Sequence, residues 1–111
     1  MMQYGGNIMK SLHYNEERYY REMFIYNYLG GDGEIVDSFI VDKGHKDGIE
    51  LHCVTNHGLI IIYNVNTRKM VTKLIARPWQ IERLYMHTKK IPSEELLELC
   101  REHQKMGFNY L

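Results

Sequence analysis

Residues 43–80 read KGHKDGIELHCVTNHGLIIIYNVNTRKMVTKLIARPWQ, and this stretch decides the fold. It contains three runs with the composition of β-strands, separated by short turns. Apolar and polar side chains alternate over 49–55, which predicts a half-buried strand with His52 on the face opposite Cys53. The run 59–63 is apolar at every position, which predicts a central strand covered on both faces. We therefore expect an antiparallel sheet at the centre of the molecule.

Two more strands complete the predicted sheet. The apolar residues of 35–41 indicate its first strand and those of 70–76 its fourth. The turn at 56–58 makes a hairpin of the second and third strands, so the strand order is that of a meander. Alternation along the fourth strand predicts one set of neighbours made of Met70, Thr72, Leu74 and Ala76, and another made of Val71, Lys73 and Ile75.

A helix is predicted before the sheet, over 8–29. It starts near Asn7 or is interrupted near Asn15, and the glycine-rich run 30–34 ends it. Its apolar stripe consists of Ile8, Leu12, Tyr19, Met23 and Tyr26, broadened by Met9, Tyr20 and Phe24. At this helical spacing the clustered tyrosines are expected to be core and core rim and not a platform for nucleic-acid bases.

Two helices are predicted after the sheet. Pro78 suits the first position of one, and Ser93 suits the N-cap of the other. The last helix has a stripe of Leu96, Leu99, His103 and Met106 and ends at Gly107. A helix, a four-stranded antiparallel meander and two C-terminal helices make an α+β domain, with the helices packed on one face of the sheet.

The length and charge of the chain limit its architecture and its partners. A chain of 111 residues suffices for one core, so 1–111 is expected to form a single domain with a flexible lead-in over 1–6. Lys plus Arg and Asp plus Glu are 14 each, so nucleic acid would need a local site. Cys53 and Cys100 form no CxxC pair, which indicates reduced, buried thiols.

No stretch of the sequence predicts contact with a membrane. The longest apolar runs fall far short of the roughly 18 residues that a membrane helix needs. The N-terminus also lacks the apolar core of a signal peptide. A soluble, cytoplasmic protein is therefore expected.

Side chains suited to phosphate and proton chemistry lie in or beside the predicted strands. Two histidines, His45 and His52, are able to converge on a bound group as general acid and general base. Phosphate binding is suggested by Arg77, by the charges of Lys43 or Lys73 and by the hydrogen-bonding groups of Thr72 and Gln80. Such a group suits phosphodiester cleavage without a metal. The plainer alternative is a loop histidine, a half-buried strand histidine and a surface arginine.

A metal site and a nucleotide-triphosphate site are not predicted. His45, His52, Cys53 and His57 are close in sequence. However, His52 and Cys53 point to opposite faces of a strand and do not readily share one tetrahedral ion. The chain also has no glycine-rich phosphate loop. No cofactor is expected.

The segments KGH, IELHCVTNHGLIIIYN and TKLIARPWQIERLY carry a family resemblance. They resemble small proteins of phages and mobile elements of Gram-positive bacteria grouped with the barnase, EndoU, colicin-nuclease and RelE-like (BECR) superfamily of metal-independent ribonucleases. The resemblance covers roughly 35–85. It implies a nuclease-like core over 34–88, a location in the cytoplasm of a bacterial host cell, and RNA bound on the open face of the sheet.

The resemblance implies a role for each candidate residue. The ribose 2′-hydroxyl would be the nucleophile, with His52 as general base and His45 as general acid. Arg77 would clamp the phosphate. Thr72 and Gln80 would position the substrate, with Lys43 as a further helper.

Two other functions remain open from the sequence. One is a non-catalytic, phage-encoded inhibitor of the anti-defence or anti-CRISPR type, which binds a host nuclease or another protein. The other is an RNA-binding module that does not cleave. Small size, neutral charge and tyrosines suit an interface as well as an RNA groove. The expected partner is thus RNA or a host defence protein.

Overall fold

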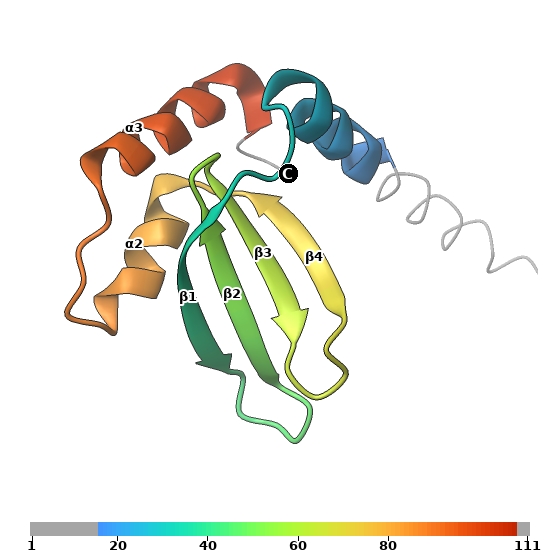
Figure 1. The fold of residues 1–111 in the computed structure, drawn as a ribbon, viewed down its shortest axis with the longest axis vertical. Coiled ribbons are helices and arrows are strands. Elements are labelled where there is room, and N and C mark those ends of the chain that lie inside the picture. Colours follow the sequence, from blue (N-terminus) through green and yellow to red (C-terminus); the bar gives the residue numbers. More distant parts are fainter. Residues whose placement is uncertain (1–15, 109–111) are drawn as a thin grey trace, which may run out of the picture.

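The computed structural model describes residues 16–108 (Figure 1). A helix over 16–23 continues into a wider π-helical turn, η1 (Phe24–Tyr28). The strands that follow are β1 (Ile35–Asp42), β2 (Ile49–Thr55), β3 (Leu59–Asn64) and β4 (Met70–Ile75). The chain ends in α2 (Pro78–Met86), α3 (Glu94–His103) and the π-helical turn η2 (Gln104–Phe108). The predicted class and element order are confirmed. The lead-in over 1–6, the helix start near Asn7 and its alternative, the interruption near Asn15, lie outside the described residues.

The four strands form one antiparallel sheet in the order β1-β2-β3-β4. His52 of β2 pairs with Phe39 of β1 and with Ile62 of β3, and Ile62 pairs in turn with Thr72 of β4. Directly opposed residues of an antiparallel sheet point to the same face, so these four side chains form one row. The pairing therefore places Thr72 on the face of His52, with one strand between them.

Helices α2 and α3 lie on the face that carries His52. Their apolar sides meet the sheet in a buried cluster that includes Phe39, Val54, Ile60, Ile81, Tyr85, Leu97 and Cys100. Pro78 occupies the first turn of α2, and the Ser93 hydroxyl accepts a hydrogen bond from the Leu96 N–H (3.1 Å), as the sequence predicts. No helix within residues 16–108 combines the length and apolar character needed to cross a bilayer.

The last turn of the helix of residues 16–28 packs on the opposite face of the sheet. Phe24 and Ile25 pack there against a second buried cluster, made with Cys53, Leu59, Ile61 and Ile75. The prediction that all helices share one face is therefore wrong. Both predicted thiols are free and buried, with Cys53 in this cluster and Cys100 in the other.

The predicted apolar stripe of this helix is wrong where the structure describes it, while its members Ile8, Met9 and Leu12 lie outside the described residues. Phe24 and Ile25 are buried, but the tyrosines expected in the core are more than half exposed: Tyr19 58%, Tyr20 58%, Tyr26 52% and Tyr28 63%. The reason is that only the last turn of the helix meets the sheet, while residues 16–23 extend beyond its edge (Figure 1). The tyrosines are surface residues.

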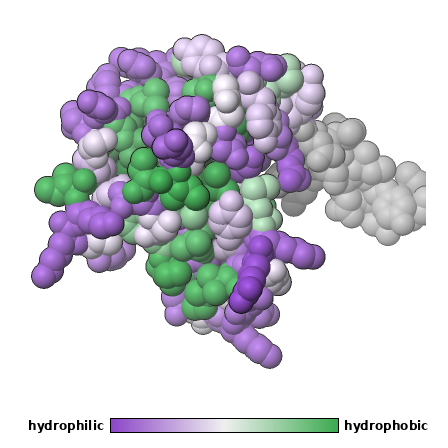
Figure 2. Space-filling model, viewed as in Figure 1, coloured by the Kyte–Doolittle hydropathy of each residue, from purple (hydrophilic) through white to green (hydrophobic). Residues whose placement is uncertain are grey.

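The sheet face opposite His52 also has a half that lies below the helices in Figure 1. Apolar side chains there have no helix over them. Figure 2 shows hydrophobic side chains gathered at the surface there. The pairing places four of them in a row across the strands, namely Ile40, Leu51, Tyr63 and Met70. Ile40 at the β1 edge is 65% exposed.

An irregularity in β4 changes its predicted side-chain pattern. Thr72 pairs with Ile62 but Met70 pairs with Tyr63, so Val71 is an extra residue in the strand. Met70 therefore lies beside Tyr63, which packs against the cluster on the face opposite Thr72. The alternation predicted for this strand holds only from Thr72 onward.

The buried side of α3 is rotated from the predicted stripe. Its buried residues are Leu96, Leu97, Cys100 and His103, whereas Met106 is 45% exposed. This side of α3 meets the sheet through Leu96, Leu97 and Cys100, and the Phe24 ring lies edge-on to His103 at 5.2 Å. Gly107 has φ +93°, which agrees with its predicted place at the helix end.

A clasp joins the loop after the N-terminal helix to the turn between β2 and β3. The Glu34 N–H donates to Asn56 Oδ1 (2.7 Å), and the Asn56 N–H donates to the Glu34 carbonyl (2.9 Å). Gly33 has φ +84° and a Cβ there would collide with the Asn56 and His57 side chains, so glycine is required. We call the contacts of Gly33, Glu34 and Asn56 the loop clasp.

Candidate functional site: a cleft between α2 and the sheet

A cleft of about 690 Å³ opens between α2 and the β1 side of the sheet. Its apolar lining includes Phe39, Ile60 and Leu84. Its polar and aromatic lining includes Lys43, His52, Trp79, Gln80, Arg83, His87 and Thr88. Three of the sequence-predicted site residues, Lys43, His52 and Gln80, therefore lie in one cavity.

His52 is held in this cleft by Glu50. The two residues are neighbours on one face of β2, and His52 Nε2 lies 3.0 Å from Glu50 Oε1. An ionised carboxylate only accepts hydrogen bonds, so Nε2 carries the proton and Nδ1 carries the lone pair in neutral His52. Burial alone raises the pKa of Glu50, but the hydrogen bonds from His52 and Lys43 outweigh it and the pKa lies below its usual value. Glu50 is thus ionised at neutral pH.

Lys43 completes this polar group at the end of β1. Its ammonium Nζ lies 3.3 Å from Glu50 Oε1, so one carboxylate oxygen faces both Lys43 and His52. The Lys43 side chain is 53% exposed, whereas those of Glu50 and His52 are 10% and 14% exposed. The ammonium therefore remains accessible to an anion in the cleft.

The α2 wall of the cleft presents three side chains spaced four residues apart. Trp79, Arg83 and His87 recur with this spacing, which aligns them along one side of the helix. All three are exposed, and Trp79 is 51% exposed. An indole, a guanidinium and an imidazole thus face the same cavity as His52.

A partly buried hydrogen bond fixes α2 against β1. The Tyr85 hydroxyl donates to an Asp37 carboxylate oxygen, and Lys90 Nζ donates to the other at 2.8 Å. The hydrogen bonds from Lys90 and Tyr85 lower the pKa of Asp37, while burial and that carboxylate raise the pKa of Tyr85. This contact holds in place the helix that walls the cleft.

Gln80 and Arg77 form the start of α2. Gln80 Oε1 accepts a hydrogen bond from the Arg77 backbone N–H at 2.8 Å, which is one half of a capping box. Gln80 reaches the cleft, but Arg77 does not line it. Arg77 lies five residues beyond Thr72, roughly 15 Å along the chain from the row of His52. The predicted phosphate clamp is therefore at the far end of the sheet.

His45 and Thr72 also lie outside the cleft. His45 is exposed in the loop between β1 and β2, where its ring lies against Gly48. Thr72 shares the row of His52, but with one strand between them their backbones are roughly 10 Å apart. The structure does not bring His45, His52, Thr72 and Arg77 together.

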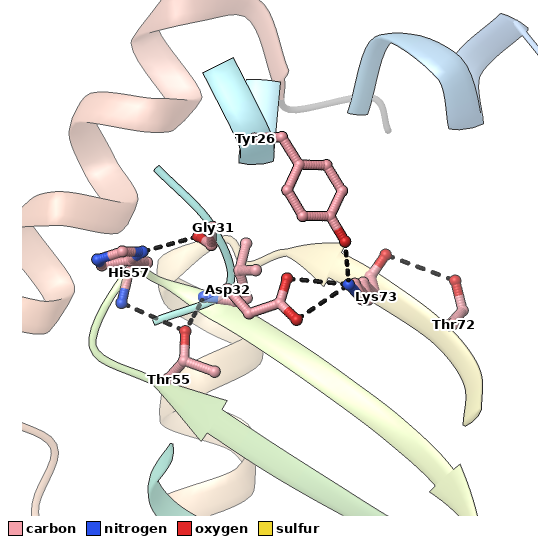
Figure 3. Close-up of polar contacts among 8 residues, drawn as sticks. Tyr26, Gly31, Asp32, Thr55, His57, Thr72 and Lys73 are labelled. Atoms are coloured by element: carbon pink, nitrogen blue, oxygen red, sulfur yellow. Dashed lines mark hydrogen bonds and ion pairs between the residues drawn. The ribbon is translucent and has the colours of Figure 1, made fainter. Parts of the chain in front are cut away.

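Lys73 belongs to the other face of the sheet (Figure 3). Its Nζ donates to both oxygens of Asp32, at 2.9 and 3.0 Å, and to the Tyr26 hydroxyl at 3.0 Å. Burial alone lowers the pKa of Lys73, but the hydrogen bonds with Tyr26 and Asp32 outweigh it and the pKa is raised. Lys73 therefore fastens the N-terminal helix and its loop to β4 and is not available to the cleft.

Sequence reasoning missed four residues of the cleft as site residues: Glu50, Trp79, Arg83 and His87. The alternation of β2 already put Glu50 on the face of His52. The spacing of the other three residues was visible in the helix sequence. What no pattern showed is that this side of α2 faces His52. Across residues 16–108, no group of three or more His, Cys, Asp or Glu side chains is arranged to hold a metal ion.

Comparison with protein-family models, with curated proteins and with solved structures finds no match to this chain.

Proposed function

We propose that this protein is a metal-independent endoribonuclease-like domain that holds RNA in the cleft between α2 and the sheet. The observation that carries the proposal is the His52 ring, which lines the cleft while Glu50 holds its Nε2. A histidine oriented in this way has the lone pair of Nδ1 available to accept a proton. The resemblance of roughly 35–85 to ribonucleases of phages and mobile elements supports the same chemistry.

The proposed reaction is attack by the ribose 2′-hydroxyl on the adjacent phosphate. His52 Nδ1 takes the hydroxyl proton, O2′ bonds to phosphorus, and the P–O5′ bond breaks to leave a 2′,3′-cyclic phosphate. His87, on the α2 side of the cleft, gives a proton to the departing O5′. Lys43 and Arg83 offset the charge that grows on the phosphate oxygens.

This proposal changes the general acid suggested by the resemblance. His45 lies in an exposed loop outside the cleft, whereas His87 lines it together with His52. Lys43 keeps its helping role and Gln80 keeps a positioning role. Arg77, Thr72 and Lys73 have no part in the reaction.

The test is cleavage of a short single-stranded RNA by the His52→Ala variant, in the presence of a metal chelator. Loss of a general base lowers the rate about 10²- to 10⁴-fold. His45→Ala is the matched control, because it removes a histidine outside the cleft and should keep the wild-type rate. The products should end in a cyclic phosphate, and a substrate with 2′-deoxyribose at the cleavage site should stay intact. An unchanged rate in His52→Ala contradicts the proposal.

A second candidate is a non-catalytic inhibitor that binds a host defence nuclease or another protein. The exposed tyrosines of the N-terminal helix favour it, since aromatic residues are enriched at protein interfaces. It uses a different surface from the cleft. In this case Tyr20→Ser should abolish the biological effect and His52→Ala should not. RNA binding by the wild-type protein without cleavage would instead indicate an RNA-binding module.

A further inference from the structure

Trp79, the single tryptophan of the chain, lies outside the buried core. The core side of α2 is formed by Ile81 and Tyr85, which are 0% and 4% exposed. Trp79 is two positions before Ile81 and points away from that side, so half of its surface remains in water. In the part of the chain that the structure describes, no aromatic ring is stacked on the indole.

The neighbours of Trp79 are those of a nucleotide site. Arg83 follows it by one helical turn on the same cleft wall, and Lys43 and His52 lie on the opposing sheet wall. Grooves that bind single strands combine positive charge along the backbone with aromatic rings on which bases stack. A cavity of about 690 Å³ also lies in the range that encloses a small ligand.

We infer that Trp79 is a base-stacking platform that restricts the cleft to unpaired nucleotides, with the phosphate next to the stacked base held between Arg83 and Lys43. A paired base is already stacked in its duplex and does not offer a face to the indole. The substrate class is therefore single-stranded RNA or an RNA loop. This inference rests on the proposed use of the cleft for RNA, and deepens it by naming the residue that selects the substrate.

The experiment uses the fluorescence of Trp79, which is the only indole in the protein. The full-length protein is titrated with a short 2′-O-methyl oligoribonucleotide, which has no free 2′-hydroxyl and is not cleaved. The single strand should quench the emission to saturation, and the same strand annealed to its complement should not. Equal quenching by both forms, or by neither, overturns the inference.

A second measurement excludes a change in folding. Binding of a dye-labelled 2′-O-methyl strand is followed by anisotropy. The Trp79→Ala variant should bind about tenfold to hundredfold more weakly, and Trp79→Phe should recover part of that loss. Met86→Ala is the control, because Met86 is 72% exposed at the end of the same helix but does not line the cleft. Equal affinity of Trp79→Ala and the wild-type protein also overturns the inference.

The result separates this inference from the proposed reaction. Quenching by the single strand, with no cleavage of ordinary RNA, removes the catalytic proposal and leaves the stacking platform in place. Cleavage without any change in Trp79 emission removes the platform and leaves the catalytic proposal.

Discussion

Each face of the sheet buries one charged side chain between two polar partners, but the surroundings of the two groups differ. On one face Glu50 is held by His52 and Lys43; on the other, Lys73 is held by Asp32 and Tyr26. The buried side chains are similarly covered, with exposed fractions of 10% for Glu50 and 12% for Lys73. The partners of Glu50 line an open cleft, whereas those of Lys73 belong to the N-terminal helix and the loop after it.

This difference indicates what each group does. The contacts of Lys73 tie the N-terminal helix and its loop to β4, so their main effect should be on stability. The contacts of Glu50 lie at the edge of the cleft, where they orient His52 and Lys43 toward the ligand that we propose for it. Substitutions at Asp32 and at Glu50 should therefore have separate effects, one on folding and the other on the proposed cleavage of RNA, and every cleavage rate predicted below rests on that proposal.

The largest effect on stability is expected at the contacts of Lys73. Asp32→Ala leaves the Lys73 ammonium covered without its carboxylate and should lower the free energy of unfolding by about 2–3 kcal/mol. Urea denaturation measures the change, with Glu82→Ala as a control because Glu82 is exposed on α2. The cleavage rate of the folded variant should equal that of the wild-type protein. A loss below about 0.5 kcal/mol would show that the contact is ordinary surface pairing.

The next largest effect, on the rate of the proposed cleavage, is expected at the contacts of Glu50. Glu50→Gln removes the charge that fixes the proton on His52 Nε2, and cleavage should slow about 10- to 100-fold, equivalent to about 1.4–2.7 kcal/mol in the barrier. The rate is compared with that of Glu82→Gln under the same conditions. If Glu50→Gln destabilises the fold as much as Asp32→Ala but keeps its rate, the assigned division between the faces is wrong.

The buried imidazole of His103 makes a pH test possible. His103 is 2% exposed, and within the described residues neither ring nitrogen has a hydrogen bond. Burial lowers its pKa from the usual 6.5, an effect opposed by Glu102 and reinforced by His57. The unfolded chain therefore takes up a proton below about pH 6.5 that the folded chain does not, so stability is lost as the pH falls.

The free energy of unfolding should fall by about 1 kcal/mol between pH 7.5 and 5.5. His103→Phe should remove most of this slope. The stabilising carboxylates Glu50 and Asp37 have lowered pKa values, and the stability they add is lost only at lower pH, below about 4.5. An unchanged slope in His103→Phe would assign the effect to another histidine.

The smallest effects are expected for two residues that the sequence placed in the site. Thr72→Val and Arg77→Ala should change the cleavage rate less than about twofold, because neither side chain lines the cleft. Rates are measured at saturating RNA so that weak binding does not contribute. A tenfold loss in Arg77→Ala would extend the site to the start of α2.

Local pattern was enough to predict the strands and helices of the described chain. Alternation in β2 predicted that His52 and Cys53 lie on different faces of the sheet, and an unbroken apolar run predicted that β3 is central. Both features can be predicted from residues that are adjacent in the sequence, because side chains alternate between the faces of a strand and a strand buried on both faces is apolar throughout. The extra residue at Val71 was not visible, because a bulge depends on the partner strand.

The site could be predicted only in part, since it depends on contacts between distant segments. His52 was predicted as a site residue because imidazole suits proton transfer. Its role, however, depends on which side of α2 packs over it. The pairing of Lys73 with Asp32 spans 41 residues, so sequence reasoning left Lys73 available for a phosphate. His45 and Arg77 were assigned by residue type, and strand direction places them at opposite ends of the sheet.

The loop clasp has a consequence for the order in which the molecule folds. The strands pair with their sequence neighbours, so their hairpins can close early through short loops. Glu34 contacts Asn56 across 22 residues, and it can do so only after the turn between β2 and β3 exists. The helix that carries Phe24 should therefore dock last and detach first. Its backbone amides should exchange with solvent deuterium while those of β3 remain protected.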